Sequence, residues 1–173
     1  MPLEDVASGR GRPPHGCHPL AHLVTQRHPM ATEIERKFLV KNDAWRGRVE
    51  SASRISQGYL VADPHVTVRV RLQGDQAFLT IKGRAKGISR SEFEYPIPVA
   101  DAAAILQGPM ALSPVDKVRH LIRAGTRLWE LDVFEGANAG LAMAEIELAA
   151  EDETFDLPGW AGDEVSGDPR YYN

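Results

Sequence analysis

The chain has 173 residues, of which 43% are hydrophobic, and it carries a formal net charge of −4. This length fits one domain with a core of its own, and the acidic balance excludes attraction to nucleic acid or an anionic membrane by overall charge. A single cysteine, Cys17, excludes an internal disulfide and a four-cysteine zinc site, and it suits a reducing compartment such as the cytoplasm. No apolar run is long enough for a membrane-spanning helix.

Residues 1–29 are rich in Pro, Gly, His and Arg and show no periodic apolar pattern. This composition predicts a disordered N-terminal extension. The segment lacks the basic start and apolar centre of a secretory signal. Because Met30 directly precedes the first periodic segment, it is a candidate translation start, and residues 30–173 form the predicted domain.

The predicted domain alternates apolar and polar side chains with a period of two, and helical periodicity is scarce, which favours a mainly antiparallel β domain. Turn signals such as Gly74-Asp75 separate neighbouring segments. In chain order, the pattern predicts strands at 32–40, 53–61, 65–73, 76–83, 90–98, 115–123, 127–135 and 142–149. Helices are predicted at 42–50, 100–107 and 151–156.

One face of most predicted strands is charged, because residues i and i+2 lie on the same side of a strand. In the first strand this places Glu33, Glu35 and Lys37 together. The same spacing recurs in Arg69/Arg71, Thr80/Lys82, Glu92/Glu94, Lys117/Arg119, Glu130/Asp132 and Glu145/Glu147. The opposite face of these strands is apolar, as in Val68/Val70 and Ile146/Leu148.

Two arrangements explain this pattern. An antiparallel sandwich with one buried and one solvated face accounts for any single strand. The same-sign pairs are harder to place on a plain surface, because like charges at this spacing repel unless a cation lies between them. The alternative is a closed barrel of about eight strands with the charges inside, where divalent cations and phosphate oxygens would satisfy them. Periodicity alone leaves both arrangements open.

A set of motifs follows the predicted strands in order. They are EIERKFLV at 33–40, QGYL at 57–60, TVRVRL at 67–72, LTIKG at 79–83, SRSEFEYPI at 89–97, DKVR at 116–119, WELDVFEG at 129–136, AEIEL at 144–148 and EVSGDPRYYN at 164–173. The set resembles the CYTH superfamily of triphosphate tunnel metalloenzymes, in which the first strand carries an ExExK signature. The resemblance covers nearly all of 31–173 and is nearest to the bacterial inorganic triphosphatases.

This resemblance implies an α+β, mainly β fold: a closed antiparallel eight-stranded tunnel barrel with a charged lumen and a few outer helices. It implies Mg²⁺ or Mn²⁺ as the cofactor, since hard cations prefer oxygen ligands. The residues that match the family's metal-binding acids are Glu33, Glu35, Asp132, Glu145 and Glu147. Those that match its phosphate-binding cations are Lys37, Arg69, Arg71, Lys82 and Arg119, with Lys117 and Arg90 as weaker matches.

Lys37 and Tyr59 match a catalytic pair of the family, although a strand tyrosine that packs against its neighbours explains Tyr59 equally well. Glu92, Glu94 and Glu130 match recurrent acids, which either support the metal ligands or contact the metal.

The activity that the resemblance implies is metal-dependent hydrolysis of a triphosphate, with inorganic tripolyphosphate, split to diphosphate and phosphate, as the first choice. GISRSEFEYPI at 87–97 resembles the inorganic triphosphatase branch, and short loops leave little material for a nucleobase pocket. The alternatives are a class IV adenylate cyclase, a thiamine triphosphatase and a non-catalytic polyphosphate-binding module. The expected partner is a small-molecule triphosphate, with neither nucleic acid nor membrane, and a homodimer is compatible with the sequence.

Overall fold

The computed structural model describes residues 31–171, so the disordered extension predicted at 1–29 lies outside the described residues. The strands are β1 (Ala31–Val40), β2 (Val49–Ala62), β3 (Val66–Gln73), β4 (Gln76–Gly83), β5 (Ser89–Pro96), β6 (Leu112–Ala124), β7 (Arg127–Phe134), β8 (Ala142–Glu147) and β9 (Ala161–Glu164). The helices are α1 (Val99–Gln107) and the short 3-10 turns η1 (Arg46–Arg48), η2 (Gly136–Asn138) and η3 (Pro169–Tyr171).

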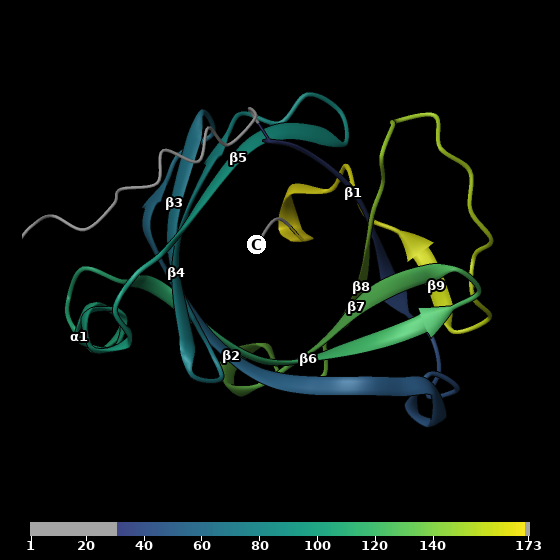
Figure 1. Ribbon diagram of the computed structural model, residues 1–173, viewed down its shortest axis with the longest axis horizontal. Coiled ribbons are helices and arrows are strands. Elements are labelled where there is room, and N and C mark those ends of the chain that lie inside the picture. Colours follow the sequence, from purple (N-terminus) through teal and green to yellow (C-terminus); the bar gives the residue numbers. More distant parts are fainter. Residues whose placement is uncertain (1–30, 172–173) are drawn as a thin grey trace, which may run out of the picture.

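The strands form one antiparallel sheet that closes on itself as a barrel (Figure 1). Their order is β5-β4-β3-β2-β6-β7-β8-β1-β9. The first half of β1 also pairs with β5, which closes a ring of eight strands and leaves β9 as an extra strand beside β1. In that closing pair Glu33 lies opposite Arg90. Farther along β1, Glu35 lies opposite Glu147 of β8. The eight-stranded tunnel barrel predicted from the family resemblance is therefore confirmed, and the open sandwich is excluded.

The apolar strand faces pack on the outside of the barrel in two separate cores. The larger core contains Phe38, Trp129 and Ile146 from the barrel wall, covered by Trp160 from the segment that leads into β9. The Trp129 and Trp160 rings meet edge to face with their centroids 5.3 Å apart, a geometry that aromatic pairs prefer. This core holds β1, β7 and β8 in place from behind, and their charged faces are thereby turned inward.

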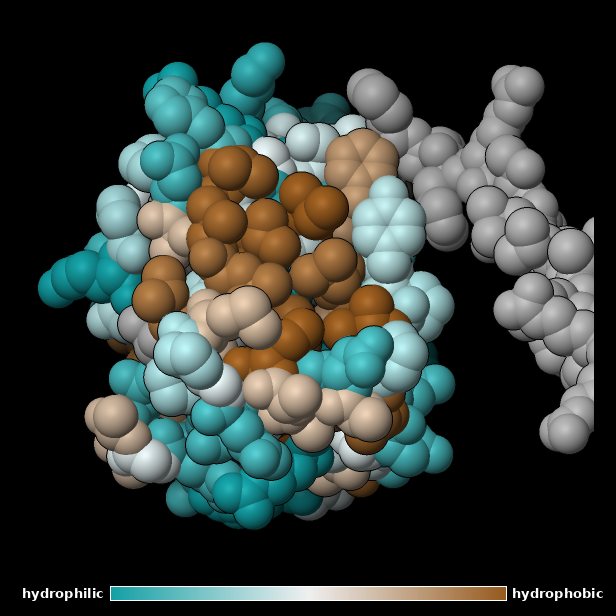
Figure 2. Space-filling view, turned by 90° about the vertical axis from the view of Figure 1, so that its left-hand side faces the viewer, coloured by the Kyte–Doolittle hydropathy of each residue, from teal (hydrophilic) through white to brown (hydrophobic). Residues whose placement is uncertain are grey.

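The smaller core lies between α1 and the outer face of β3 and β4 (Figure 1). Ala102 of the helix is fully buried against Val70 and Ala77. The helix begins after Pro98 and ends at Gly108, as helix-boundary residues commonly do. The helix predicted at 100–107 is confirmed. Figure 2 shows that apolar side chains also gather on the surface of this side of the barrel.

The helix predicted at 42–50 is wrong. The chain makes only the turn η1 and then enters β2, where Val49 pairs with Ile122 of β6. Trp45 is buried and its ring lies 4.9 Å from that of His120, so tertiary packing fixes this segment. Gly47 and the β-branched Val49 are weak helix formers that do not resist it.

The helix predicted at 151–156 is also wrong, since the residues after β8 form a turn and then an extended segment. Phe155 of this segment packs against Trp129, with ring centroids 5.7 Å apart. A helix of this length is marginal by itself, so side-chain burial decides the conformation. The short strand β9 was not predicted, because AGDE has no apolar alternation. Within residues 31–171, no helix has the length and apolar character needed to cross a membrane.

Candidate active site in the barrel lumen

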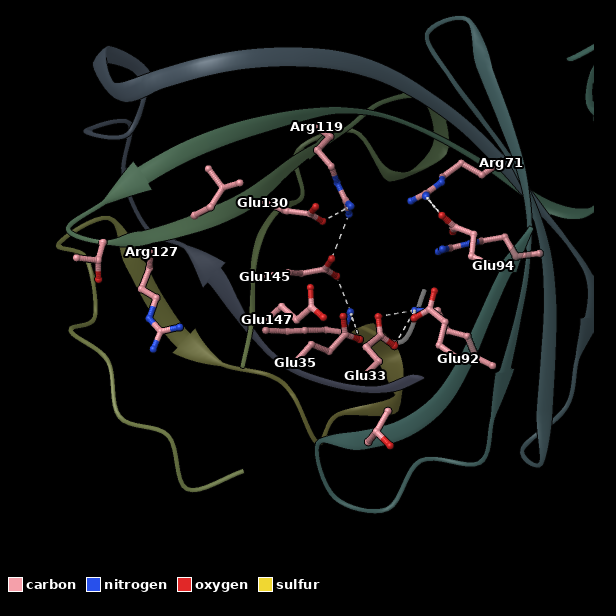
Figure 3. A pocket seen from close by; sticks show the side chains of 16 residues that line it. Glu33, Glu35, Arg71, Glu92, Glu94, Arg119, Arg127, Glu130, Glu145 and Glu147 are labelled. Carbon is pink, nitrogen blue, oxygen red and sulfur yellow. Dashed lines mark hydrogen bonds and ion pairs between the residues drawn. The ribbon is translucent and has the colours of Figure 1, made fainter. Parts of the chain in front are cut away.

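The barrel encloses a cavity of about 670 Å³ whose walls are charged (Figure 3). Its lining contains most of the predicted site residues: Glu33, Glu35, Lys37, Arg69, Arg71, Lys82, Arg119, Glu145 and Glu147. Glu92, Glu94 and Glu130, predicted as further acids, line it too. The inward direction of these side chains follows from strand alternation, because the outward positions between them are held by the two apolar cores.

Lys37 sits deep in the lumen between two carboxylates. Its Nζ lies 2.5 Å from Oε1 of Glu145 and 3.1 Å from Oε1 of Glu35. Burial by itself would lower the pKa of Lys37, but Glu145 and Glu35 raise it above the ordinary value. Burial would likewise raise the pKa of Glu145, yet Lys37, Arg119 and Lys117 hold it well below the usual range. Lys37 is therefore a firmly protonated cation, and Glu145 is an ionised acid that neutralises it.

A second cluster surrounds Asp132, which is fully buried. Nε and Nη2 of Arg119 each donate to Asp132 at 2.7 Å, and Nζ of Lys117 lies 2.6 Å from Oδ2 of the same carboxylate. Arg119 also contacts Glu130 and, at 3.1 Å, Glu145. Burial lowers the pKa of Lys117, and Asp132 opposes that shift. Among the described residues that line the cavity, neither Asp132 nor Lys117 appears, although the sequence predicted both for the site.

On the side of β4 and β5, cations again alternate with acids. Nζ of Lys82 lies 2.9 Å from Glu33 and 3.0 Å from Glu92. Arg90 bridges Glu33 and Glu35, at 2.8 and 2.6 Å. Arg90, a weak match from its motif alone, is thus an integral part of the network around the first two acids of β1.

The wall formed by β2 and β3 has fewer acids beside its cations than the other parts of the lumen. Nη2 of Arg71 donates to both oxygens of Glu94, at 3.1 and 3.0 Å. Arg69 is only 7% exposed and has no ion pair within residues 31–171. Tyr59 lies opposite Arg69 in the sheet and hydrogen-bonds to it. Burial raises the pKa of Tyr59, although Arg69 counteracts part of this effect. In the structure, Tyr59 therefore partners Arg69, while Lys37, its predicted catalytic partner, is held by carboxylates.

Glu147 is the acid of the lumen that lacks a cation. It lies directly opposite Glu35 on the neighbouring strand, and no ion pair joins it to any residue in the described part of the chain. Two carboxylates in this relation repel unless a cation lies between them. Among residues 31–171, no three His, Cys, Asp or Glu side chains are arranged to hold a metal. Mg²⁺ commonly uses only one or two carboxylates with water and substrate phosphate, so Glu35 and Glu147 fit it.

Alternation within the strands does not reveal every lining residue. Thr126, in the turn between β6 and β7, and Arg127 and Leu128, the first two residues of β7, also line the cavity. Arg127 is ion-paired to Glu153. Figure 3 shows Arg127 apart from the central network. Leu128 shares the strand face of Glu130, but Thr126 precedes the strand and Arg127 points to the other face, so strand alternation does not predict these two at the lumen.

Comparison with known proteins agrees with this geometry. The CYTH domain model matches residues 31–172. The chain belongs to the CYTH domain family. The inorganic triphosphatase of Acetivibrio thermocellus is 44% identical over 144 residues, covering 83% of this chain and 92% of that protein. The inorganic triphosphatase of Nitrosomonas europaea is 36% identical over 146 residues, covering 82% of this chain and 94% of that protein. The family resemblance predicted from the motifs is confirmed.

Solved CYTH structures share the fold. The crystal structure of an inorganic triphosphatase superposes with a TM-score of 0.59 at 36% identity, covering 83% of this chain and 93% of that chain. A Hippeastrum protein described as having a dominant triphosphatase activity superposes with a TM-score of 0.56 at 16% identity, covering 68% of this chain and 80% of that one. At this low identity, the second likeness shows the tunnel fold alone.

Proposed function

We propose that this CYTH protein hydrolyses inorganic tripolyphosphate to diphosphate and phosphate in a reaction that depends on a divalent metal. One observation carries the proposal. Among the charged residues that line the lumen, Arg69 and Glu147 alone have no ion pair within residues 31–171. A buried cation and an acid left open in one cavity suit a ligand that combines phosphate with metal. The two curated relatives are inorganic triphosphatases, which supports the same substrate.

The phosphate-binding role falls first to Arg69 and Arg71. Phosphoryl transfer requires placement and neutralisation of charge far more than covalent help from the protein. The planar guanidinium offers paired donors that match phosphate oxygens. Because Arg69 has no carboxylate partner within residues 31–171, a phosphate can bind it without displacing an existing ion pair. Lys82 and Arg119, both engaged by acids, would add charge to the same lumen.

We assign the metal to Glu35 and Glu147, with Glu33 beside them. Their oxygen donors suit Mg²⁺ or Mn²⁺. When bound, such an ion lowers the pKa of a bound water and neutralises phosphate charge. Asp132 and Glu145 match metal ligands of the family as well, but both are buried, whereas the side chains of Glu33 and Glu35 are partly exposed. In our proposal, these two acids fix the orientation of Lys37 and Arg119 for the substrate.

Lys37 and Tyr59 remain the proposed catalytic residues, with roles adjusted to their surroundings. The raised pKa of Lys37 favours an ammonium that stabilises charge on the transferring phosphoryl group over a base that accepts a proton. Burial also raises the pKa of Tyr59, so its hydroxyl is a hydrogen-bond donor near neutral pH. Beside Arg69, that hydroxyl is placed to orient a phosphate oxygen or the attacking water.

Parallel assays with tripolyphosphate, ATP and thiamine triphosphate, each with Mg²⁺ and with Mn²⁺, test this function. We expect the highest kcat/KM for phosphate release from tripolyphosphate, and none without metal. Cyclic AMP formed from ATP would instead identify an adenylate cyclase, and preference for thiamine triphosphate would identify that substrate. Tight, salt-sensitive binding of long polyphosphate without phosphate release would identify a binding module. A cytoplasmic location and a homodimer stay predictions.

A further inference from the structure

Gln57 of β2 is an amide that nothing in the proposed mechanism uses. Its side chain is fully buried, at 0% exposure. Neither Nε2 nor Oε1 has a hydrogen-bond partner among the residues that the structure describes. Buried side-chain amides are nearly always hydrogen-bonded, so one with both ends open needs a specific explanation.

The register of the sheet places this amide beside the phosphate-binding arginines. Gln57 lies directly opposite Arg71 on β3, and Tyr59, the next inward position of β2, lies opposite Arg69. Residues that face each other in an antiparallel pair share one side of the sheet, with Cα atoms about 4.5 to 5.5 Å apart. Gln57 therefore belongs to the inner face of the barrel. Its register neighbours Arg71 and Arg69 line the cavity.

Arg69 and Arg71 have the donors that the Gln57 oxygen lacks. The Nε atoms of Arg69 and Arg71 are also buried and lack a hydrogen-bond partner within residues 31–171. Arg71 directs Nη2 at Glu94, so this end of its guanidinium is engaged while the inner N–H is not. One small region of the wall thus contains an amide oxygen without a donor and two guanidinium N–H groups without an acceptor. An amide oxygen is a natural acceptor for such an N–H.

We propose that Gln57 is a positioning residue in the wall formed by β2 and β3, which carries the proposed phosphate-binding residues Arg69 and Arg71. When a triphosphate takes the outer N–H groups of Arg71, Oε1 of Gln57 accepts the inner Nε–H and holds the guanidinium toward the lumen in place of Glu94. The amide makes no contact with substrate; it acts through the arginine. This inference rests on the proposed function, because it assumes that a triphosphate binds at this wall.

The test uses Gln57→Leu, which keeps the approximate side-chain volume and removes both polar atoms. Binding of tripolyphosphate is measured by calorimetry in EDTA, and hydrolysis is measured with Mg²⁺. We expect Kd and KM to rise about tenfold, the effect of one lost hydrogen bond to a charged group. We expect kcat to stay the same, as for an interaction made equally in the ground and transition states. The melting temperature should stay the same or rise, because a buried amide without a partner has been removed.

A matched control is Gln73→Leu on β3. Gln73 donates from Nε2 to Oγ of Ser53 at 3.1 Å and lies outside the cavity lining. This variant should lose stability and keep the wild-type Kd and KM, the reverse of the Gln57→Leu result. Should Gln57→Leu not fold, Gln57→Met is measured in its place with the same expectation.

Unchanged Kd and KM in a folded Gln57 variant would overturn the inference, as would failure of both variants to fold, since the amide would then serve the fold. If the wild type binds tripolyphosphate but releases no phosphate, the hydrolytic function fails while the Kd comparison still tests Gln57. If the wild type does not bind tripolyphosphate at all, both proposals are overturned together.

Discussion

Two walls of the same lumen differ in how far their buried charged and polar groups are paired with other groups of the described chain. In the paired wall, defined here as Lys37, Lys117 and Arg119 with Asp132 and Glu145, each cation is held by acids at 2.5 to 3.1 Å. Such a network is internally satisfied, and removing one partner leaves an uncompensated buried charge. The paired wall therefore contributes mainly to the fold and to the fixed placement of its cations.

The arginine wall, defined as Arg69 and Arg71 with Tyr59 and Gln57, is incomplete by comparison. Arg69 has no carboxylate partner in the described chain, and the Nε atoms of both arginines and the Gln57 amide lack hydrogen-bond partners there. Burial, reinforced by the neighbouring Arg69, lowers the pKa of Arg71, a sign that positive charge is crowded here. The difference supports our proposal that charge paired within the protein serves stability, whereas charge left open serves the ligand.

The largest effect on stability is expected for Asp132→Asn in the paired wall. It would leave Lys117 and Arg119 buried with less negative charge beside them, so we expect the free energy of unfolding to fall by about 3 to 5 kcal/mol. Chemical denaturation with urea measures this change. A loss below about 1 kcal/mol, the range of an exposed pair, would show that the paired wall does not support the fold.

Glu147→Gln should separate activity from stability. Glu147 is exposed and has no ion pair in the described region, so the melting temperature should not change. Because changes in residues that merely support metal ligands cost 10- to 100-fold, loss of a direct ligand should lower metal-dependent turnover by about 100-fold or more. Phosphate release at saturating Mg²⁺ measures this. Retained turnover would remove Glu147 from the metal site.

Arg69→Met tests the arginine wall in the same manner. Loss of one charge-assisted contact to phosphate should raise KM for tripolyphosphate about tenfold or more. The free energy of unfolding should be maintained or increased, since a buried cation without a carboxylate partner is replaced by an apolar side chain. Steady-state kinetics and urea unfolding are the two measurements. A destabilised variant with normal KM would place Arg69 among the structural cations.

The pH dependence of stability should reflect the buried charges of the paired wall. The pKa of Glu145 is depressed in the folded state, so its stabilisation is present above the ordinary value of 4.5 and is lost as pH falls below it. The pKa of Lys37 is raised, so its contribution persists up to the ordinary value of 10.5 and is lost only at higher pH. Urea unfolding across this range measures both limits. Glu145→Gln should weaken the acid limit, and Arg69→Met should leave it in place.

The smallest effect is expected at the barrel exterior. Arg123 and Glu50 form an ion pair at 2.8 Å, with side chains 53% and 45% exposed. Glu50→Ala should change the free energy of unfolding by less than about 1 kcal/mol and leave catalysis unchanged. A larger change would mean that exposure does not separate structural from incidental ion pairs in this barrel.

Strand alternation separated the charged face of each strand from its apolar face, and the family resemblance then predicted that the charged faces line a closed lumen. Alternation could not assign partners, since Lys37 and Glu145 are 108 residues apart and meet only through the register of β1 with β8. For the same reason, alternation did not show that Asp132, expected as a metal ligand, is ion-paired to Lys117 and Arg119. Gln57 carried no charge and raised no expectation. The two wrong helices lie where the buried Trp45 and the partly buried Phe155 pack against the barrel, a tertiary effect that local propensity does not contain.

The central claim is that Arg69 binds phosphate and Glu147 binds metal. Its most direct test is calorimetry of tripolyphosphate binding without metal, measured for the wild type, Arg69→Met and Glu147→Gln. Glu147→Gln should bind as tightly as the wild type or more tightly, because an acid has been removed from the lumen, and Arg69→Met should bind about tenfold more weakly. The reverse order, with normal affinity in Arg69→Met and weak binding in Glu147→Gln, would contradict the account.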